Sequence, residues 1–303
     1  MQNLPSLISN YLESCACVKR LSADTIKAYR TDLEQFSEFT NQTLADKEEL
    51  VQYIKYINQQ YAPRSAKRKL ATVRAFYREL FLNEILETNP FDKLRAHIHS
   101  PKQLPRAIAI HTVHVILQSA YDSYSDKHRY TMRDIVVLEL LFNTGMRVAE
   151  LCALTKESFI LHDNVLRILI NGKGQKQRVI QITNPELLTL FKVYCNKYDE
   201  EIKNQGYILY NQQGHPLSPQ SVRRIINKYV DKSDLNYHIT PHMFRHTFAT
   251  VLLEEGVDIR YIQALLGHSS ISTTQIYTQV AAHKQTLLLA EKHPRSKMKF
   301  ELQ

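Results

Sequence analysis

The stretch TPHMFRHTFATVLLEEGVDIRYIQALLGHSSISTTQIYT, which begins at Thr240, constrains the fold more than any other part of the chain. Thr240 suits an N-cap, and Pro241 suits the first helical position because the N–H that proline lacks is unpaired there. At about 100° per residue, His242 and Arg245 share one side of this helix and Phe244 lies roughly opposite. The pattern predicts a helix from Pro241 that buries its apolar side and presents a histidine and an arginine together.

The rest of this stretch predicts two further helices. Gly256 ends the first helix, and a short helix follows that ends at Gly267 with His268 just beyond it. A capping-box pattern that begins at Ser272 predicts another helix, which carries Tyr277 in its first turns. Two histidines, an arginine and a tyrosine are thus placed by helix signals within one short stretch.

The charge balance favours a polyanionic partner. Lys and Arg number 39 against 30 for Asp and Glu, a net charge of +9 over 303 residues, which favours nucleic acid over an acidic small molecule. Four cysteines, with no CxxC pair and no paired His/Cys spacing, suggest neither disulfides nor a zinc site. With no apolar run of membrane-spanning length and no secretory signal pattern, we expect a cytoplasmic protein without membrane contact.

The first hundred residues are predicted to be helical. The expected helices are Ser6 to Val18, Ala23 to Thr40, Asp46 to Gln60 and Arg64 to Leu82. The fourth has a cationic face opposite its apolar face, and residues 61–78 contain six basic side chains and no acid. A solvated face is the plain alternative, but a phosphate backbone would supply the missing charge. The candidate DNA-binding side chains here are Arg64, Lys67, Arg68, Arg74 and Arg78.

A proline-rich segment without periodicity, residues 89–106, is predicted to be a linker. It separates a helical N-terminal domain, residues 1–88, from a mostly helical domain, residues 107–303. In the second domain, helices are expected at His111 to Ser123, Met132 to Phe142, Pro185 to Asn196 and Ser218 to Tyr229. VLRILI and RVIQI predict a β-hairpin around the loop NGKGQK. Arg223 and Arg224, on the helix from Ser218, form a second candidate DNA-binding face.

Six side chains together indicate chemistry on a phosphodiester. They are Arg147, Lys173, His242, Arg245, His268 and Tyr277. Guanidinium groups bind phosphate oxygens in pairs and stay charged, and a phenol can form a covalent ester. Taken singly, each has a plain structural explanation: Arg147 can pair with Glu150, a hairpin lysine is often only exposed, and the chain has 17 tyrosines. No acidic cluster accompanies them, so a two-metal site is not expected.

The segments LLFNTGMRVAEL, NGKGQKQRVIQI, the stretch from Thr240 and HPRS resemble the tyrosine recombinase (integrase) superfamily, most closely its Xer-type members. The resemblance spans about residues 104–296 and is less specific in the N-terminal domain. It implies a mainly α protein with the DNA breaking-rejoining enzyme fold: a helical core-binding domain, then a mostly α catalytic domain with a small antiparallel sheet. It also implies roles for the six residues: Arg147 and Arg245 as phosphate clamps, Lys173 as general acid, His242 and His268 as supporting histidines, and Tyr277 as nucleophile. Glu150 would support Arg147.

The resemblance further implies a site-specific recombinase that needs no metal, ATP or other cofactor. Tyr277 would form a 3′-phosphotyrosyl link, and strands would be exchanged through a Holliday junction. The expected partners are double-stranded DNA with short inverted core sites and a homotetramer, or a heterotetramer with a related recombinase. The sequence lacks a segment resembling the arm-binding domain of lambda-type integrases, and residues 283–293 resemble the family's terminal helix that docks on a neighbouring protomer. A type IB-like topoisomerase and a non-catalytic DNA-binding protein are the alternatives, and integration, excision and multimer resolution all stay open.

Overall fold

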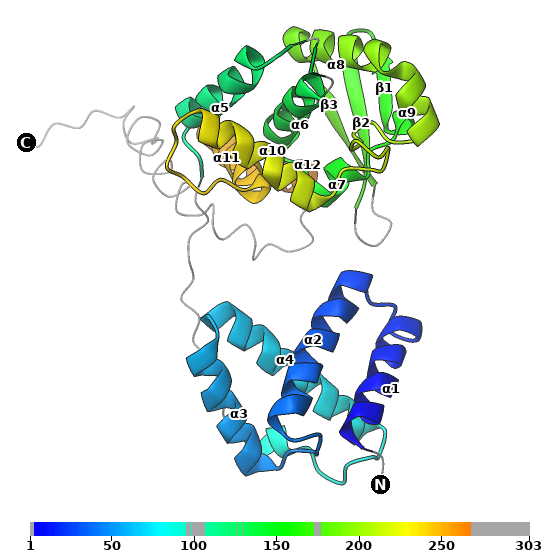
Figure 1. Ribbon diagram of the computed structural model, residues 1–303, viewed down its shortest axis with the longest axis vertical. Helices are drawn as coiled ribbons and strands as arrows, with labels where there is room; N and C mark the ends of the chain where they lie inside the picture. Colours follow the sequence, from blue (N-terminus) through cyan, green and yellow to red (C-terminus); the bar gives the residue numbers. More distant parts are fainter. Residues whose placement is uncertain are drawn as a thin grey trace, which may run out of the picture. The chain divides into compact units, whose positions relative to one another are not determined.

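The computed structural model describes residues 3–94, 98, 107–125, 127–128, 130–172 and 177–267. Its backbone divides into two compact units, Met1–Gln103 and Leu104–Gln303. Each unit has its own apolar core. The two units are drawn in Figure 1.

The N-terminal unit is a bundle of helices around an aromatic-rich core (Figure 1). Its helices are α1 (Leu4–Cys17), α2 (Ala23–Phe39), α3 (Lys47–Gln60), α4 (Pro63–Leu82) and the 3₁₀ helix η1 (Pro90–Lys93). Phe36 on α2 contacts the rings of Tyr53 on α3 and Tyr77 on α4 edge to face, which joins three helices at one point. The four α-helices confirm the predicted elements to within two residues at each end.

Local sequence signals explain where these helices begin. Ser22 accepts a hydrogen bond from the backbone N–H of Thr25, and Asp46 forms a reciprocal capping box with Glu49. Pro63 occupies the first turn of α4, where no N–H donor is needed. The starts of these helices are therefore predictable from residues that either accept a hydrogen bond from a free backbone N–H or, as with proline, have no N–H to satisfy.

A buried carboxylate, Asp32 of α2, anchors α4. It is 0% exposed and accepts hydrogen bonds from Lys69 at 3.1 Å and Thr72 at 3.1 Å, and it also pairs with Arg68. The Lys69 ammonium additionally lies over the ring of Tyr61, 4.5 Å from its centroid. Arg68 therefore differs from the other basic residues of α4, because its guanidinium helps to neutralise a charge inside the protein.

The first part of the predicted linker is folded against the N-terminal core. Asn89 caps η1 through its side chain, and Phe91 is buried against the ring of Tyr77. The Arg74 guanidinium lies 5.4 Å from the centroid of the Phe91 ring. Segment 89–94 thus contributes an apolar anchor that its proline-rich composition did not reveal.

The C-terminal unit places a small sheet at one side of a helical core (Figure 1). Its helices are α5 (Ile110–Asp122), α6 (Thr131–Thr144), α7 (Val148–Cys152), η2 (Lys156–Ser158), α8 (Pro185–Lys197), α9 (Asp199–Gln205), α10 (Pro219–Lys232), α11 (Pro241–Glu254) and α12 (Ile259–Leu266), and its strands are β1 (Phe159–His162), β2 (Val165–Asn171) and β3 (Gln177–Ile182). Helix α6 lies at the centre and is apolar around most of its circumference.

The sheet is antiparallel in the order β1-β2-β3. On β2 the side chains of Leu166, Ile168 and Ile170 are buried while the residues between them are more exposed, which is the period-2 pattern of a strand covered on one face. The predicted hairpin is confirmed as β2 and β3. Strand β1 was not predicted, because its four residues are too short to establish a period.

Gly145 ends α6 and brings α6, α11 and α12 close together. Its φ of +56° is left-handed, a conformation that glycine adopts without steric cost. A Cβ built on Gly145 would lie 2.5 Å from Cδ1 of Phe248 on α11 and 3.0 Å from Cδ2 of Leu266 on α12. The three helices can therefore approach this closely only because residue 145 has no side chain.

We expect Gly145→Ala to lower the free energy of unfolding by roughly 2–4 kcal/mol, since backbone strain and a steric clash combine. Gly206→Ala is the matched control, because Gly206 also ends a helix at positive φ but has no atom within 4 Å of its Cβ position. The control should show only the backbone cost, about 1 kcal/mol. Denaturant unfolding of the full chain measures both, and equal losses would contradict the steric argument.

Candidate active site

Three arginines donate hydrogen bonds to the last three carbonyl groups of the α12 segment. Arg178 Nε donates to the Leu265 carbonyl at 2.8 Å, Arg245 Nη2 to the Leu266 carbonyl at 2.7 Å, and Arg147 Nη2 to the Gly267 carbonyl at 3.1 Å. Carbonyls at a helix C-terminus lack partners within the helix and carry the negative end of its dipole. The end of α12 thus gathers three guanidinium groups from three different parts of the chain.

Glu150 links two of these arginines. Its Oε1 accepts from Nη1 of Arg147 at 2.9 Å and from Nη1 of Arg178 at 3.0 Å. Its Oε2 accepts from the backbone N–H of Arg147 at 2.7 Å and from Nη2 of Arg178 at 2.7 Å. Burial alone would raise the pKa of Glu150, but these bonds and charges outweigh it and hold the pKa at about 2. The carboxylate is ionised at neutral pH, and its stabilising contribution is lost only as the pH falls below its usual pKa toward 2.

Arg245 is almost completely buried, with 4% of its surface exposed. Besides the Leu266 carbonyl, its guanidinium donates to the Gly145 carbonyl at 2.8 Å. The predicted helix from Pro241 is confirmed as α11, but its Arg245 side is not open as the helical wheel suggested. Both Ala249 and Arg245 are buried there, because the ends of α6 and α12 cover that side.

His242 stands at the first turn of α11, with part of its surface exposed to solvent and part buried. Partial burial, together with the positive charges of Arg245 and Arg147, lowers the pKa of His242 from its usual value of 6.5. The lowered pKa favours the neutral form of the imidazole at physiological pH. A neutral imidazole beside guanidinium groups can accept a proton, or donate a hydrogen bond, without adding to the positive charge.

The structure brings together Arg147, Glu150 and Arg245, and His242 lies about one helical turn before Arg245 on α11. Lys173, His268 and Tyr277 lie outside the described residues. Lys173 belongs to the loop between β2 and β3, and His268 directly follows Gly267 in the sequence. The described part of the site therefore ends at the residue before the second predicted histidine.

Two residues of this site were missed in the sequence. Arg178 was read only as part of a hairpin strand, since one cation on a strand carries no signal of its partners. Gly145 lies within the segment LLFNTGMRVAEL, but its steric role depends on Phe248, which lies far away in the sequence.

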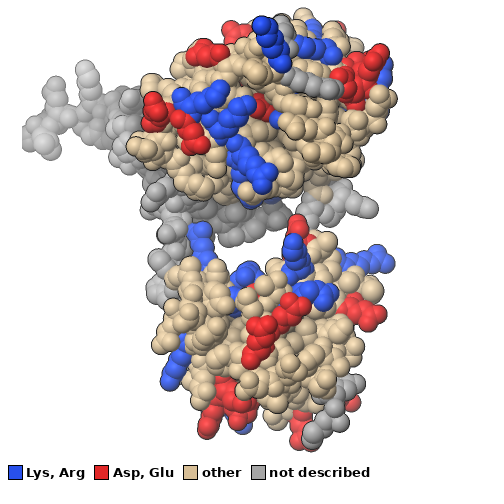
Figure 2. All heavy atoms as spheres, in the orientation of Figure 1, with Lys and Arg blue, Asp and Glu red and all other residues tan. Residues whose placement is uncertain are grey.

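The candidate DNA-binding side chains lie on exposed helix faces, with two distinctions. Arg64, Lys67 and Arg78 are exposed on α4, whereas Arg68 pairs with Asp32 and Arg74 is partly buried against Phe91. In the C-terminal unit, a band of basic side chains crosses the face formed by α10 (Figure 2). The band consists of Arg223, Arg224, Lys228 and Lys232.

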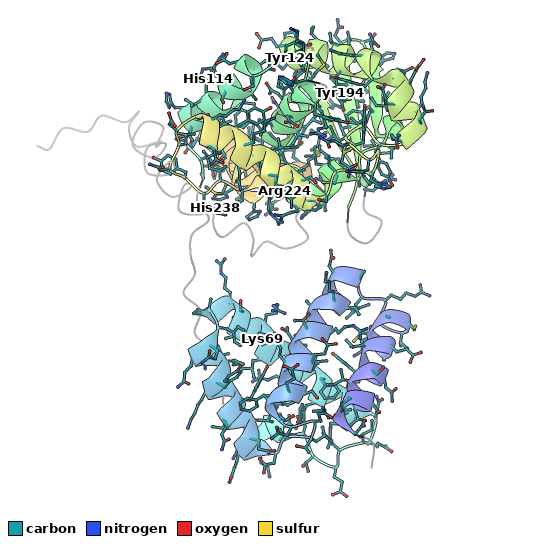
Figure 3. All side chains as sticks on the ribbon, in the orientation of Figure 1. Lys69, His114, Tyr124, Tyr194, Arg224 and His238 are labelled. Carbon is teal, nitrogen blue, oxygen red and sulfur yellow. The ribbon has the colours of Figure 1, made fainter. Side chains whose placement is uncertain are left out.

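Helix α10 begins beside α7, the helix that follows Arg147. Arg223 and Arg224 are exposed near this end, and Arg224 is labelled in Figure 3. Farther along, Lys228 donates to buried Asp134 at 2.9 Å and Lys232 donates to Ser123 at 2.9 Å. The arginines at the start of α10 are thus the part of the band closest to the arginine site.

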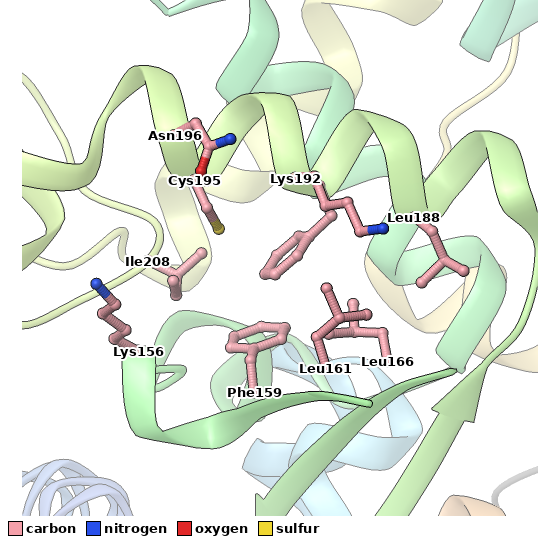
Figure 4. A pocket seen from close by; sticks show the side chains of 10 residues that line it. Lys156, Phe159, Leu161, Leu166, Leu188, Lys192, Cys195, Asn196 and Ile208 are labelled. Carbon is pink, nitrogen blue, oxygen red and sulfur yellow. The ribbon is translucent and has the colours of Figure 1, made fainter. Parts of the chain in front are cut away.

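A separate cavity of about 240 Å³ lies between the β1–β2 side of the sheet and α8 (Figure 4). Phe159, Leu166 and Phe191 form its apolar walls, and Lys156 and Lys192 lie at its edges. None of the arginines or histidines of the candidate site lines it. The cavity is therefore distinct from the proposed phosphate chemistry.

Both units match known protein families. Residues 114–284 match the phage integrase family, and residues 8–84 match the phage integrase N-terminal SAM-like domain. A tyrosine recombinase of Agathobacter rectalis is 46% identical over 99% of this chain and 100% of its own length. Tyrosine recombinase XerC of Bacillus subtilis is 33% identical over 98% of this chain and 99% of its own length. The chain belongs to the phage integrase family, the tyrosine recombinases.

Solved structures show the same fold. XerH recombinase bound to a palindromic difH substrate matches with a TM-score of 0.76 and 21% identity, over 94% of this chain and 85% of that chain. A lambda integrase tetramer bound to a Holliday junction matches with a TM-score of 0.70 and 19% identity, over 89% and 78%. The predicted fold class is therefore confirmed: mainly helical, with a small antiparallel sheet in the C-terminal unit. Among the helices that the structure describes, none is both long and apolar enough to cross a bilayer.

We expect the pKa of His242, measured by NMR titration, to lie below 6.5 and to rise toward 6.5 in Arg147→Gln, because one of the charges that oppose protonation is removed. The rise should be partial, since burial and Arg245 also lower the pKa. Loss of the resonance in His242→Gln assigns it among the 13 histidines. Arg223→Gln, a change on α10, should leave the pKa in place. A wild-type pKa at or above 6.5 would contradict the electrostatic account.

Proposed function

We propose that this protein is a site-specific DNA recombinase that cleaves and rejoins strands through a 3′-phosphotyrosyl intermediate. The observation that carries the proposal is the gathering of Arg147 and Arg245 at the end of α12, with His242 in the first turn of α11, the helix that carries Arg245. From that end the chain continues into the segment that contains His268 and Tyr277. Membership of the tyrosine recombinase family supports the same reaction.

The charges of the site suit a phosphodiester. Arg147, Arg178 and Arg245 carry three positive charges, and Glu150 neutralises one of them. The cluster of these four side chains therefore has an excess of two positive charges. A phosphate diester carries one negative charge, and a second develops on its oxygens in the pentavalent transition state. Arginine suits this task because its planar donors match phosphate oxygens and its charge does not depend on pH.

The proposed reaction begins with in-line attack of the Tyr277 phenol on the scissile phosphate. A bond forms between the phenolic oxygen and phosphorus, and the bond from phosphorus to the 5′ oxygen breaks. Attack by the 5′ hydroxyl of a partner duplex reverses the step and joins the new strands. Because one ester replaces another at each step, the reaction needs neither ATP nor an added cofactor, and exchange proceeds through a Holliday junction.

Two proton transfers accompany each cleavage. Neutral His242 is the proposed acceptor of the phenol proton, which agrees with the lowered pKa of its imidazole. Lys173 is the proposed donor to the departing 5′ oxygen, and β2 and β3 fix both ends of the loop that carries it. His268 is assigned a hydrogen bond to the phosphate. Glu150 is assigned to hold Arg147 at its backbone N–H and its guanidinium.

The basic helix faces are the proposed DNA contacts. Arg64, Lys67 and Arg78 of α4 are exposed, and residues 61–78 contain no acid to neutralise them. Arg68 and Arg74 belong to the same face, but Arg68 also pairs with buried Asp32 and Arg74 also packs against the ring of Phe91. In the C-terminal unit, Arg223 and Arg224 are the corresponding proposed contacts. The two faces, joined by the linker at 89–106, would bind one duplex.

The proposed assembly is a tetramer on two DNA sites with short inverted core sequences, formed by one recombinase or by two related ones. The lambda integrase structure that this fold matches is a tetramer bound to a Holliday junction, and XerH is bound to a palindromic site. Residues 283–293 are proposed to join neighbouring protomers. A cytoplasmic location, with access to DNA, is part of the same proposal.

The decisive test uses a nicked duplex that traps the covalent intermediate. The core site is first selected from random duplexes by binding to the protein. Wild-type protein should form a protein–DNA adduct that survives denaturation, and Tyr277→Phe should form none while binding the same duplex, because only the nucleophilic oxygen is removed.

Exchange between two such sites separates recombination from topoisomerase-like relaxation, which would release supercoils without joining partners. Binding without any adduct would leave the non-catalytic DNA-binding alternative. An undiminished adduct in Tyr277→Phe would refute the assignment of the nucleophile.

For the N-terminal face, Lys67→Glu should weaken DNA binding and lower the slope of log affinity against log salt by roughly one, because a phosphate contact is lost. Lys55→Glu on α3 changes the net charge equally at an exposed site outside the basic face, so it should change binding far less. Arg68 is unsuited to this test because its replacement would also remove one of the two cations that pair with buried Asp32. Equal weakening by both variants would argue against a specific α4 contact.

A further inference from the structure

Arg178 of β3 makes a set of contacts that none of the proposed catalytic roles uses. Its guanidinium donates twice to Glu150, through Nη1 to Oε1 at 3.0 Å and through Nη2 to Oε2 at 2.7 Å, and its Nε donates to the Leu265 carbonyl at 2.8 Å. The side chain is 11% exposed. One side chain thus joins β3, the Arg147–Glu150 turn and the last turn of α12.

The Glu150 carboxylate is divided between Arg147 and Arg178. Each carboxylate oxygen accepts one bond from each of these residues. If Arg178 were absent, half of these bonds would be lost and a buried carboxylate would have to reorient. Arg147 would then lose the fixed acceptor that holds both its backbone N–H and its guanidinium.

Arg178 also lies directly against the end of α12. A Cβ built on Gly267 would be 3.1 Å from Nη1 and 3.3 Å from Cδ of Arg178. Gly267 has a φ of +65° and offers its carbonyl to Arg147 at 3.1 Å. Arg178 therefore lies against Gly267, the residue whose carbonyl group binds Arg147 and which directly precedes His268 in the sequence.

We propose that Arg178 is a positioning residue of the strand-transfer site, which holds Glu150 and the end of α12 in register so that Arg147 and the chain leading to His268 and Tyr277 meet the phosphate correctly. The inference rests on the proposed function. It extends that function by assigning a residue of β3 that does not touch the reacting atoms. Its effect is on the rate of cleavage rather than on DNA affinity.

Arginine is required at this position because three donors of one planar group are used at once. Lysine keeps the charge but presents it at a single point, so it cannot bind both Glu150 oxygens and the Leu265 carbonyl together. A misplacement of about 1 Å in a site of this kind lowers the rate by up to about 100-fold. Arg178→Lys therefore changes the hydrogen-bond geometry at Glu150 and Leu265 while keeping the positive charge.

Arg133 supplies a matched control within the same unit. It is 12% exposed, donates through Nε and Nη2 to Asp134 at 3.2 and 2.7 Å, and donates through Nη1 to the Tyr210 carbonyl at 2.9 Å. Arg133→Lys disrupts a network of the same size and burial, one that contains none of the proposed catalytic residues. The two variants should lose similar thermal stability.

The experiment compares wild type, Arg178→Lys and Arg133→Lys at a temperature where all three are folded. It measures the rate of adduct formation on the nicked duplex and the dissociation constant for the intact duplex. Arg178→Lys should lower the adduct rate about 10- to 100-fold while the dissociation constant changes less than about threefold. Arg133→Lys should leave both quantities near the wild-type values.

A double-mutant comparison tests whether Arg178 acts through Glu150. Glu150→Gln with Arg178→Lys should be no slower than the slower single variant, because both changes disrupt the same link. If Arg178→Lys does not fold, Glu150→Gln replaces it, since a neutral amide cannot accept from both arginines through both of its ends. Glu150→Gln should then show the same fall in rate with unchanged affinity.

The outcomes are distinguishable. A wild-type protein that binds the selected duplex but forms no adduct would overturn the proposed function and this inference together. Three results would overturn the inference alone. They are a normal adduct rate in Arg178→Lys, equal falls in adduct rate in the Arg178 and Arg133 variants, and fully additive falls in adduct rate in the double variant. A normal rate in Glu150→Gln would do the same where that variant is the one assayed.

Discussion

The site depends on the free carbonyl groups at the end of α12. A helix terminus inside a protein must find donors for these groups, and here three arginines supply them. The arginines come from the turn after α6, from β3 and from α11. The need of the α12 carbonyl groups for donors therefore brings together side chains that are far apart in the sequence. The same groups that satisfy the helix end are those whose charge suits a phosphate.

Glu150 allows the guanidinium groups of Arg147 and Arg178 to lie close together. Guanidinium groups repel one another, and a carboxylate held ionised between two of them offsets that repulsion. It does so with bonds to a backbone N–H as well as to side chains, so the position of Arg147 is set by the start of α7. Arg245 is held differently, by two carbonyl groups within a buried environment.

Helix starts and the hairpin were predictable because their signals are local in the sequence, whereas the six-residue site stays a prediction, of which the structure describes Arg147, His242 and Arg245. Helix starts are predicted by single residues at the N-cap or in the first turn, here Ser22, Asp46 and Pro241. The contacts of Arg178 and the burial of Arg245 could not be predicted, because both involve residues far apart in the chain. The pairing of Arg68 with Asp32 was hidden for the same reason: a helical wheel shows where a cation points, but not the neighbour that receives it.

The two units have separate apolar cores, and this separation has an evolutionary consequence. If α4 contacts DNA as proposed, substitutions on its surface would change how the N-terminal unit meets a duplex without altering the packing that positions the arginines around α12. DNA recognition by this unit could therefore diverge while the arginine site stays constant. A lineage of such enzymes could then alter part of its target recognition by changing the N-terminal unit, or by exchanging it whole, and keep the arginine site of the other unit nearly unchanged.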